Sequence, residues 1–231
     1  MKQLVIGLGE VGQALYNVLN DTYGDTIFKR DLEAGDLPET FEVLHICIPF
    51  TDGFVDEVKA YQAQYKPSLT IIHSTVSLGT SDLCGAVHSP VRGVHPYLVD
   101  GLRTFVKYFG GSQAFDAARI FSSICPVFTT DKAKNTEAGK MWCTTQYFAQ
   151  IDLEKNIHKY CKDNDLDFDF VYTHLNQTYN EGYEKLGMKH VVRSIIQHVP
   201  GPIGGHCVVS NAKLLAIPYS YRLLKRDKTY D

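Results

Sequence analysis

Residues 2–12 read KQLVIGLGEVG, a short apolar strand followed directly by three glycines in the pattern G-x-G-x-x-G. In such a turn the first glycine allows a tight bend, the second lets the backbone approach a pyrophosphate, and the third lets the next helix pack close to the strand. The helix amino terminus then faces the anion. This segment predicts a Rossmann βα unit that holds a dinucleotide. The expected phosphate-binding residues are Gly7, Leu8, Gly9, Glu10, Val11 and Gly12.

An acidic residue supports the dinucleotide interpretation. Asp31 follows the second expected strand, about 20 residues after the glycines, where a carboxylate accepts hydrogen bonds from ribose hydroxyls. The basic neighbours Lys29 and Arg30 leave NADP open beside NAD, since a basic side chain suits a 2′-phosphate. Strand alternation puts Lys29 and Asp31 on one side and favours NAD. A methyltransferase that binds S-adenosylmethionine stays an alternative, because it also uses a glycine loop and an acid on the second strand.

Short β-rich runs alternate with amphipathic segments through the first half of the chain. This alternation predicts an α/β fold with a doubly wound, mostly parallel Rossmann sheet covered by helices on both faces. Strands are expected at 2–6, 25–30, 43–49, 69–73, 85–88, 104–109 and 127–129, and helices at 11–19, 53–64 and 114–123.

The pattern changes after residue 131, where helical spacing of apolar residues replaces the strand pattern. Residues 133–163 predict one long helix, residues 166–186 and 189–197 predict further helices, and the Pro- and Gly-rich residues 198–206 predict a loop. We therefore expect a dinucleotide-binding domain at 1–131 and a helical substrate and dimerisation unit at 132–231. A helix this long needs a partner surface, which a homodimer supplies.

Composition narrows the partners and the compartment. The 231 residues are 44% hydrophobic and 21% charged, with a net charge of -3, which gives no general attraction to nucleic acid or to anionic membranes. The six cysteines form no CxxC pair and no metal-ligand spacing, which suits a reducing compartment and predicts no metal site. No signal peptide or long apolar run is evident. We expect a cytoplasmic protein with a small-molecule substrate.

The order of motifs resembles the family of UDP-glucose and UDP-N-acetylmannosamine dehydrogenases, which also includes GDP-mannose dehydrogenase. The matching pieces are the loop GLGEVG at 7–12, the strand ending in Pro49, STV at 74–76, SPVR at 89–92, TEAGK at 136–140 and GPIGGHC at 201–207. The last piece is the most specific. The resemblance implies that Pro49, Ser74 and Thr75 also line the cofactor site.

The resemblance implies a chemistry for two residues. In that family the cysteine after Gly-Gly-His captures an aldehyde intermediate and the helix lysine assists oxidation; Cys207 and Lys140 are the matching positions. Hydride transfer oxidises an alcohol, a thiolate adds to the aldehyde, and a second hydride transfer leaves a thioester for hydrolysis. The expected substrate-binding residues are His88, Arg92, Thr144, Gly205 and His206.

Three departures fall on this chemistry. Val91 stands where the family has a glutamate, Thr144 where it has an asparagine, and Asn211 where it has an aspartate. The sequence also stops soon after the cysteine segment, without the family's second Rossmann-like domain. The resemblance therefore implies a shortened, divergent member that oxidises a CH-OH group. A dinucleotide-binding protein without turnover is the alternative that these departures favour.

Two other enzyme classes share single features with the chain. The segment GVHPY at 93–97 is similar to the His-Pro segment of prephenate dehydrogenases, in which His95 would be a general base or a donor. The β-hydroxyacid dehydrogenases also carry a lysine on the helix after the Rossmann domain, as Lys140 does here. The structural alternatives are a buried, inert Cys207 and a surface ion pair between Glu137 and Lys140.

Overall fold

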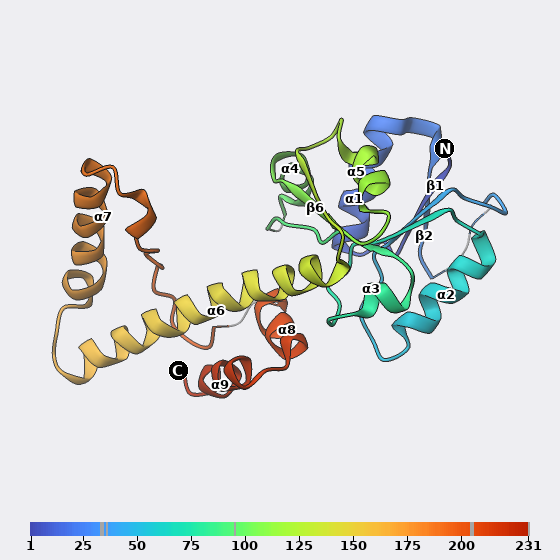
Figure 1. Ribbon diagram of the computed structural model, residues 1–231. Coiled ribbons are helices and arrows are strands. Elements are labelled where there is room, and N and C mark those ends of the chain that lie inside the picture. Colours follow the sequence, from blue (N-terminus) through green and yellow to red (C-terminus); the bar gives the residue numbers. More distant parts are fainter. Residues whose placement is uncertain (33–34, 36, 95, 204–205, 231) are drawn as a thin grey trace. The chain divides into compact units, whose positions relative to one another are not determined.

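The computed structural model describes residues 1–32, 35, 37–94, 96–203 and 206–230 (Figure 1). Of His206 it describes the backbone alone. The chain divides into two compact units, Met1–Lys140 (unit 1) and Met141–Asp231 (unit 2). Among the described helices, none combines the length and the apolar character that crossing a membrane requires.

Unit 1 is a seven-stranded sheet with helices on both faces (Figure 1). The strands lie in the order β2-β1-β3-β4-β5-β6-β7, and all neighbours are parallel except β5 and β6. Their bounds are β1 (Gln3–Ile6), β2 (Ile27–Arg30), β3 (Val43–Ile46), β4 (Leu69–Ile72), β5 (Val87–His88), β6 (Lys107–Gly110) and β7 (Val127–Thr130). The chain first adds β2 on one side of β1 and then adds β3 and β4 on the other side, so the strand order reverses between β1 and β3. Ligands of doubly wound sheets bind at such a switch point. The predicted fold class is confirmed.

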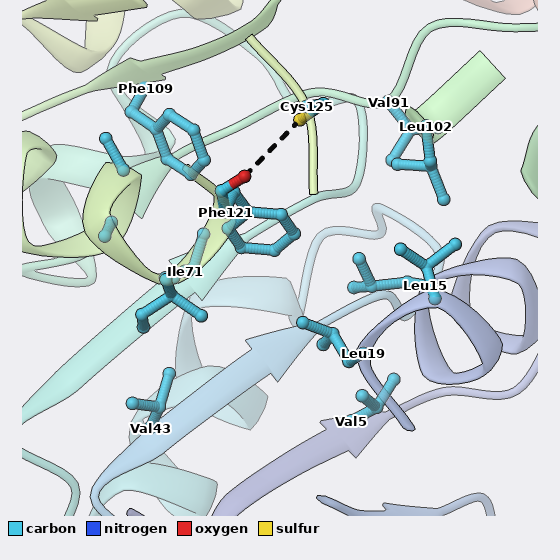
Figure 2. Close-up of a cluster of buried hydrophobic side chains, with 14 of the residues drawn as sticks. Val5, Leu15, Leu19, Val43, Ile71, Val91, Leu102, Phe109, Phe121 and Cys125 are labelled. Carbon is cyan, nitrogen blue, oxygen red and sulfur yellow. Dashed lines mark hydrogen bonds between the residues drawn. The ribbon is translucent and has the colours of Figure 1, made fainter. Parts of the chain in front are cut away.

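The helices of unit 1 cover the sheet in two groups. One face packs against α1 (Glu10–Tyr23), α4 (Leu98–Thr104) and α5 (Ala114–Phe121); the other packs against α2 (Phe54–Tyr65) and α3 (Thr80–Leu83). Figure 2 shows the first of these cores, in which Val5, Ile71 and Phe109 of the strands meet Leu15, Leu19 and Phe121 of the helices. Side chains of alternate strand residues point to opposite faces, so each strand contributes to both cores.

Unit 2 is helical. The helix α6 (Ala133–Asp163), which begins in unit 1, has the bounds that the sequence predicts. A π-helical segment at Asp169–His174 continues into α7 (Leu175–Lys185), and α8 (His206–Leu215) and α9 (Pro218–Asp227) follow. A small apolar cluster of Phe148, Ala212 and Leu223 joins α6, α8 and α9.

One predicted helix is wrong. Residues 189–197 contain only a short 3-10 turn at Lys189–Val191, and the rest has no regular structure. Side chains of the preceding helical segment take the backbone amides there: Arg193 donates to Asn180 Oδ1 at 2.8 Å, and Ile196 donates to the Tyr172 hydroxyl at 3.0 Å. The predicted helix at 166–186 is present, with its π-helical first part.

Candidate functional site

The three glycines of the first turn occupy three different environments. Gly7 has φ +87°, and a Cβ there would meet the Cys47 carbonyl at 2.9 Å. A Cβ on Gly12 would lie 1.7 Å from the Gly7 carbonyl oxygen, so only glycine fits. A Cβ on Gly9 would meet nothing within 4 Å. The outer two glycines thus make the turn and the close packing, and the middle one faces open space of the kind a phosphate needs.

The first turn of α1 presents its backbone N–H groups beside this space. Gly9 is the N-cap, and no side chain caps the helix. Free N–H groups and the helix dipole favour an anion there. Leu8, Val11 and the first-turn acid Glu10 surround the cap. The turn therefore fits a pyrophosphate by backbone geometry, and Glu10 adds a negative side chain at its rim.

Asp31 lies next to the same turn. It follows β2 directly, and its Oδ1 is 3.5 Å from the Leu8 backbone nitrogen. The carboxylate is exposed, so it is accessible to sugar hydroxyls at the carboxyl edge of the sheet. This is the geometry expected of the ribose-binding acid.

The two basic neighbours of Asp31 are engaged by aromatic side chains. The Arg30 guanidinium donates to the hydroxyl of Tyr65 at 2.5 Å and lies over the rings of Tyr61 and Tyr65. The Lys29 ammonium lies 4.7 Å from the centroid of the Tyr16 ring. Both cations thus have partners within the protein.

The ends of β3 and β4 form the neighbouring wall. The Ser74 hydroxyl donates to the Ile48 carbonyl at 2.6 Å and ties the segment after β4 to the segment after β3. Pro49 is exposed and Thr75 is half-buried. These three predicted cofactor-site residues thus follow adjacent strands at the edge where β1 ends.

Glu137 anchors the start of α6 to the segment after β4. The side chain is fully buried, and its two oxygens accept from the backbone amides of Gly79 at 2.6 Å and Ser81 at 2.8 Å. Glu137 therefore lies in the interior and caps α3, unlike the surface position that the ion-pair alternative requires. Sequence reasoning missed this role, although the spacing from Glu137 to Lys140 drew attention to the segment.

Lys140 lies one turn further along α6. Its ammonium donates to the Val91 carbonyl at 2.9 Å. The resemblance implies a glutamate at the position of Val91, and in this chain the backbone carbonyl of that position contacts the lysine. The amine is half-buried. The Val91 carbonyl thus holds the Lys140 side chain within unit 1.

His88 is a fully buried side chain of β5. Its Nε2 is 3.2 Å from the Ser74 carbonyl, and its Nδ1 is 2.8 Å from the Thr136 hydroxyl. Because a carbonyl only accepts, we assign the proton to Nε2, with Nδ1 accepting from Thr136. Burial lowers the pKa of His88 to about 3, which keeps the ring neutral. Both nitrogens are used within the protein, so the predicted contact of His88 with substrate stays a prediction.

The other predicted residues of this region are less enclosed. Arg92 is exposed and lies over the rings of Phe105 and Tyr108, at 5.4 and 5.8 Å. His95 lies outside the described residues, so its predicted role stays a prediction.

The predicted residues of unit 2 lie on α6 and α8. Cys207 is exposed in the first turn of α8, and Asn211 is one turn further along. The Asn211 amide donates to the Thr144 hydroxyl at 3.1 Å. Two of the three positions that depart from the pattern of that family thus contact one another directly. Gly205 and the His206 side chain lie outside the described part.

A hollow in unit 2 was not expected from the sequence. It has a volume of about 490 Å³ and is lined by His158, Phe168, Asp169, Thr173 and residues 195–198. His198 stacks on His158 with ring centroids 3.6 Å apart, and its Nδ1 is 2.7 Å from the buried carboxylate of Glu154. These contacts hold residues 195–198 against α6.

A buried polar chain in unit 1 was also missed. Gln3, His45, His73 and Lys107 are all buried on the α1 and α5 face of the sheet. His45 contacts Gln3 Oε1 at 2.9 Å and His73 at 3.0 Å, and the Lys107 ammonium is 3.3 Å from His73 Nδ1. The available signal was polar residues within otherwise apolar strands.

Comparison with known proteins identifies the fold. No protein-family model matches the chain, and a search of characterised proteins finds no match. Among solved structures, UDP-D-ManNAc dehydrogenase from Pyrococcus horikoshii is similar over 99% of this chain and 69% of its own, with TM-score 0.77 and 17% identity. UDP-N-acetyl-mannosamine dehydrogenase from Staphylococcus aureus is similar over 99% and 68%, with TM-score 0.72 and 18% identity.

A hydroxyacid enzyme has the same fold over more of its length. The 3-hydroxyisobutyrate dehydrogenase of Mycobacterium tuberculosis, solved with L-serine, is similar over 99% of this chain and 93% of its own, with TM-score 0.71 and 13% identity. At these identities the likeness is one of fold. The chain has the Rossmann-like fold of dehydrogenases and spans about two thirds of the two sugar-nucleotide enzymes.

Proposed function

We propose that this protein is an NAD-dependent dehydrogenase that oxidises a hydroxyl group of a small molecule, with a sugar nucleotide as the first candidate and a hydroxyacid as the second. The observation that supports it most is the contrast among the glycines: Gly7 and Gly12 are closed by neighbouring backbone, whereas Gly9 borders open space at an uncapped helix start. That combination suits a pyrophosphate.

The surroundings of Asp31 favour NAD over NADP. A 2′-phosphate needs a cation at the end of β2. The two cations there already have partners, because Arg30 donates a hydrogen bond to Tyr65 and Lys29 lies over the Tyr16 ring. A carboxylate at that position repels a phosphate. When bound, NAD supplies a hydride acceptor.

Lys140 is the candidate for the substrate oxygen. An ammonium donates hydrogen bonds, and its charge stabilises an alkoxide that develops on the reacting hydroxyl. Cys207, which is exposed in the first turn of α8, is the candidate nucleophile toward an aldehyde. His95 is a further candidate for a general base.

The experiment is in two stages. Calorimetry with NAD+ and NADP+ tests binding, and NADH formation with a panel of sugar nucleotides and hydroxyacids tests turnover. We expect NAD+ to bind more tightly, and Lys140→Ala to reduce turnover by about 100-fold or more without weakening NAD+. Cys207→Ser should stop the reaction at the aldehyde, whereas the matched control Cys143→Ser, at another exposed cysteine, should have no effect.

A dinucleotide-binding protein without turnover is the second candidate. The bond between Asn211 and Thr144 favours it, because both side chains replace polar groups of the resembling family and contact one another. In that case NAD+ binds, no substrate of the panel is oxidised, and Cys207 reacts with iodoacetamide no faster than Cys143.

A further inference from the structure

Lys107 is a buried cation at the carboxyl edge of the sheet. It is the first residue of β6 and 4% exposed. Because β6 runs antiparallel to β5, it begins where the parallel strands β1, β3 and β4 end. Its ammonium donates to the Ser89 carbonyl at 3.1 Å and lies 5.6 and 5.2 Å from the ring centroids of Phe109 and Phe121.

The Ser89 carbonyl fixes the direction of the hydrogen-bond chain, because it lies 2.9 Å from His73 Nδ1. A carbonyl only accepts, so His73 Nδ1 carries the proton and donates to Ser89, to which the Lys107 ammonium donates as well. His73 Nε2 then accepts from His45 Nδ1, and His45 Nε2 lies 2.9 Å from the side-chain amide of Gln3. The chain satisfies both imidazoles in their neutral form.

Within the described part of the chain, no group around Lys107 supplies a counter-ion. The titratable groups that act on it or on its chain are the thiols of Cys47 and Cys125, the imidazoles of His45, His73 and His88, and the ammonium of Lys140. Burial raises the pKa of Cys47 to about 12 and also raises that of Cys125, so both thiols are neutral. Among the described residues, Lys107 forms no ion pair with a carboxylate. Burial lowers its pKa to about 7.

One residue separates this lysine from the glycine turn. Cys47 lies near enough to Lys107 for each to affect the pKa of the other, and Cys47 packs directly against the turn. A Cβ on Gly12 would lie 3.2 Å from Cys47 Cβ, and a Cβ on Gly7 would lie 2.9 Å from the Cys47 carbonyl. An anion in the turn would therefore act on Lys107 from the far side of Cys47, through an interior that screens charges weakly.

We propose that binding of a dinucleotide pyrophosphate at the glycine turn is coupled to uptake of one proton by Lys107. This inference rests on the proposed function, because it requires the dinucleotide to bind there. The neutral amine accepts a proton from solvent and becomes an ammonium, and no other bond changes. The amine donates to the Ser89 carbonyl in both states, so the hydrogen-bond chain keeps its direction. Affinity therefore falls as pH rises through the range in which Lys107 loses its proton.

Calorimetry of NAD+ in PIPES, HEPES and Tris at pH 7.5 and equal ionic strength tests the coupling. If protons are taken up, the observed enthalpy changes with the ionisation enthalpy of the buffer, and we expect an uptake of about 0.3–0.5 proton per site. The affinity should fall about fourfold between pH 6.5 and 8.5. At pH 5.5 the uptake should vanish, because Lys107 is then protonated before NAD+ arrives.

Two variants separate Lys107 from other groups. Lys107→Met should bind NAD+ with no proton uptake, and the matched control Lys59→Met, which removes an exposed lysine of α2, should keep it. NAD+ binding without uptake in the wild type, or with equal uptake in Lys107→Met, overturns the coupling and leaves the proposed function intact. If Lys107→Met does not fold, the pH profile of the wild type decides. Absence of heat with NAD+ and NADP+ in every buffer overturns the proposed function and this inference with it.

Discussion

Units 1 and 2 differ in how much of their apolar surface they bury. Unit 1 buries apolar side chains on both faces of its sheet, whereas the buried apolar cluster of unit 2 consists of Phe148, Ala212 and Leu223. Of residues 164–203, all of which the structure describes, only Tyr172 is buried. Since apolar burial is the main stabilising contribution to folding, unit 1 is stabilised by its own interior, and unit 2 leaves much of its apolar surface exposed.

The interior of unit 1 also contains buried histidines, and because of them we expect acid to lower the free energy of unfolding. Burial lowers the folded pKa of His45 and His88 to about 3 and holds that of His73 well below its usual value. Below about pH 6.5 the unfolded chain binds protons that the folded chain does not, so stability falls as pH decreases toward about 3. Between pH 6.5 and 4.5 we expect a loss of about 2 kcal/mol for each of His45 and His88.

Urea unfolding at the two pH values measures this loss. Far-ultraviolet circular dichroism follows both units, whereas Trp142, the single tryptophan, lies in unit 2. Acid should lower the midpoint seen by circular dichroism more than the midpoint seen by fluorescence. Equal unfolding free energies at pH 6.5 and 4.5 would contradict the buried neutral imidazoles.

The glycine turn offers the next largest effect. Gly12→Val puts a side chain into the Gly7 carbonyl, so unit 1 should lose about 3 kcal/mol or more. Gly9→Ala adds one methyl group into open space and should change stability by less than about 1 kcal/mol, while NAD+ affinity falls at least tenfold. Urea unfolding and calorimetry on the matched pair test this. A Gly9→Ala protein that binds NAD+ normally would show that the pyrophosphate lies elsewhere.

Glu137 tests whether the start of α6 depends on its buried carboxylate. Glu137→Gln replaces an oxygen that accepts from a backbone amide with an NH2 group that faces it, and should cost about 2 kcal/mol. The control is Asp82→Asn on the adjacent α3, whose exposed ion pair with Lys134 is 3.7 Å long and should contribute less than about 0.5 kcal/mol. Thermal unfolding of both variants at pH 7 makes the comparison, and equal losses would be evidence against the cap.

The smallest expected effect concerns the exposed apolar side chains of unit 2. If a second copy covers them in a homodimer, Leu186→Glu (71% exposed) should weaken the dimer by about 1–2 kcal/mol, or roughly tenfold in the dissociation constant. Phe115→Glu of unit 1, equally exposed at 70%, should leave the dimer unchanged. Sedimentation velocity over a concentration series measures both. A monomeric wild-type chain would overturn this prediction.

The sequence predicted what depends on neighbours along the chain. The strand and glycine turn at 2–12, the alternation of strands and helices and the bounds of α6 follow from local pattern, and the structure has them. The buried hydrogen-bond chain from Gln3 to Lys107 could not be predicted, because β1, β3, β6 and the residue after β4, all distant in sequence, contribute to it. The predicted helix at 189–197 failed for a related reason: helical spacing of apolar residues says nothing about Asn180 and Tyr172, which bond the backbone there.

The candidate site divides in the same way. Sequence pattern located the glycine turn and Asp31, because a motif and its spacing define them. It also singled out Lys140, but that amine donates to the carbonyl of Val91, a backbone group that sequence comparison does not reveal. Glu137 was considered as a surface partner and is instead buried, since only the folded chain brings Gly79 and Ser81 to it.

The join between β5 and β6 is narrow: β5 has two residues, and its pairing with the antiparallel β6 runs through His88 and Gly110. The segment that contains β6, α5 and β7 can therefore separate from β5 with few backbone hydrogen bonds broken. The amides between β5 and β6 should exchange with deuterium sooner than those between β1 and β3. Lys107 reaches across the same join to Ser89 and His73. A change in the charge of Lys107 should therefore change how often the pairing between β5 and β6 opens.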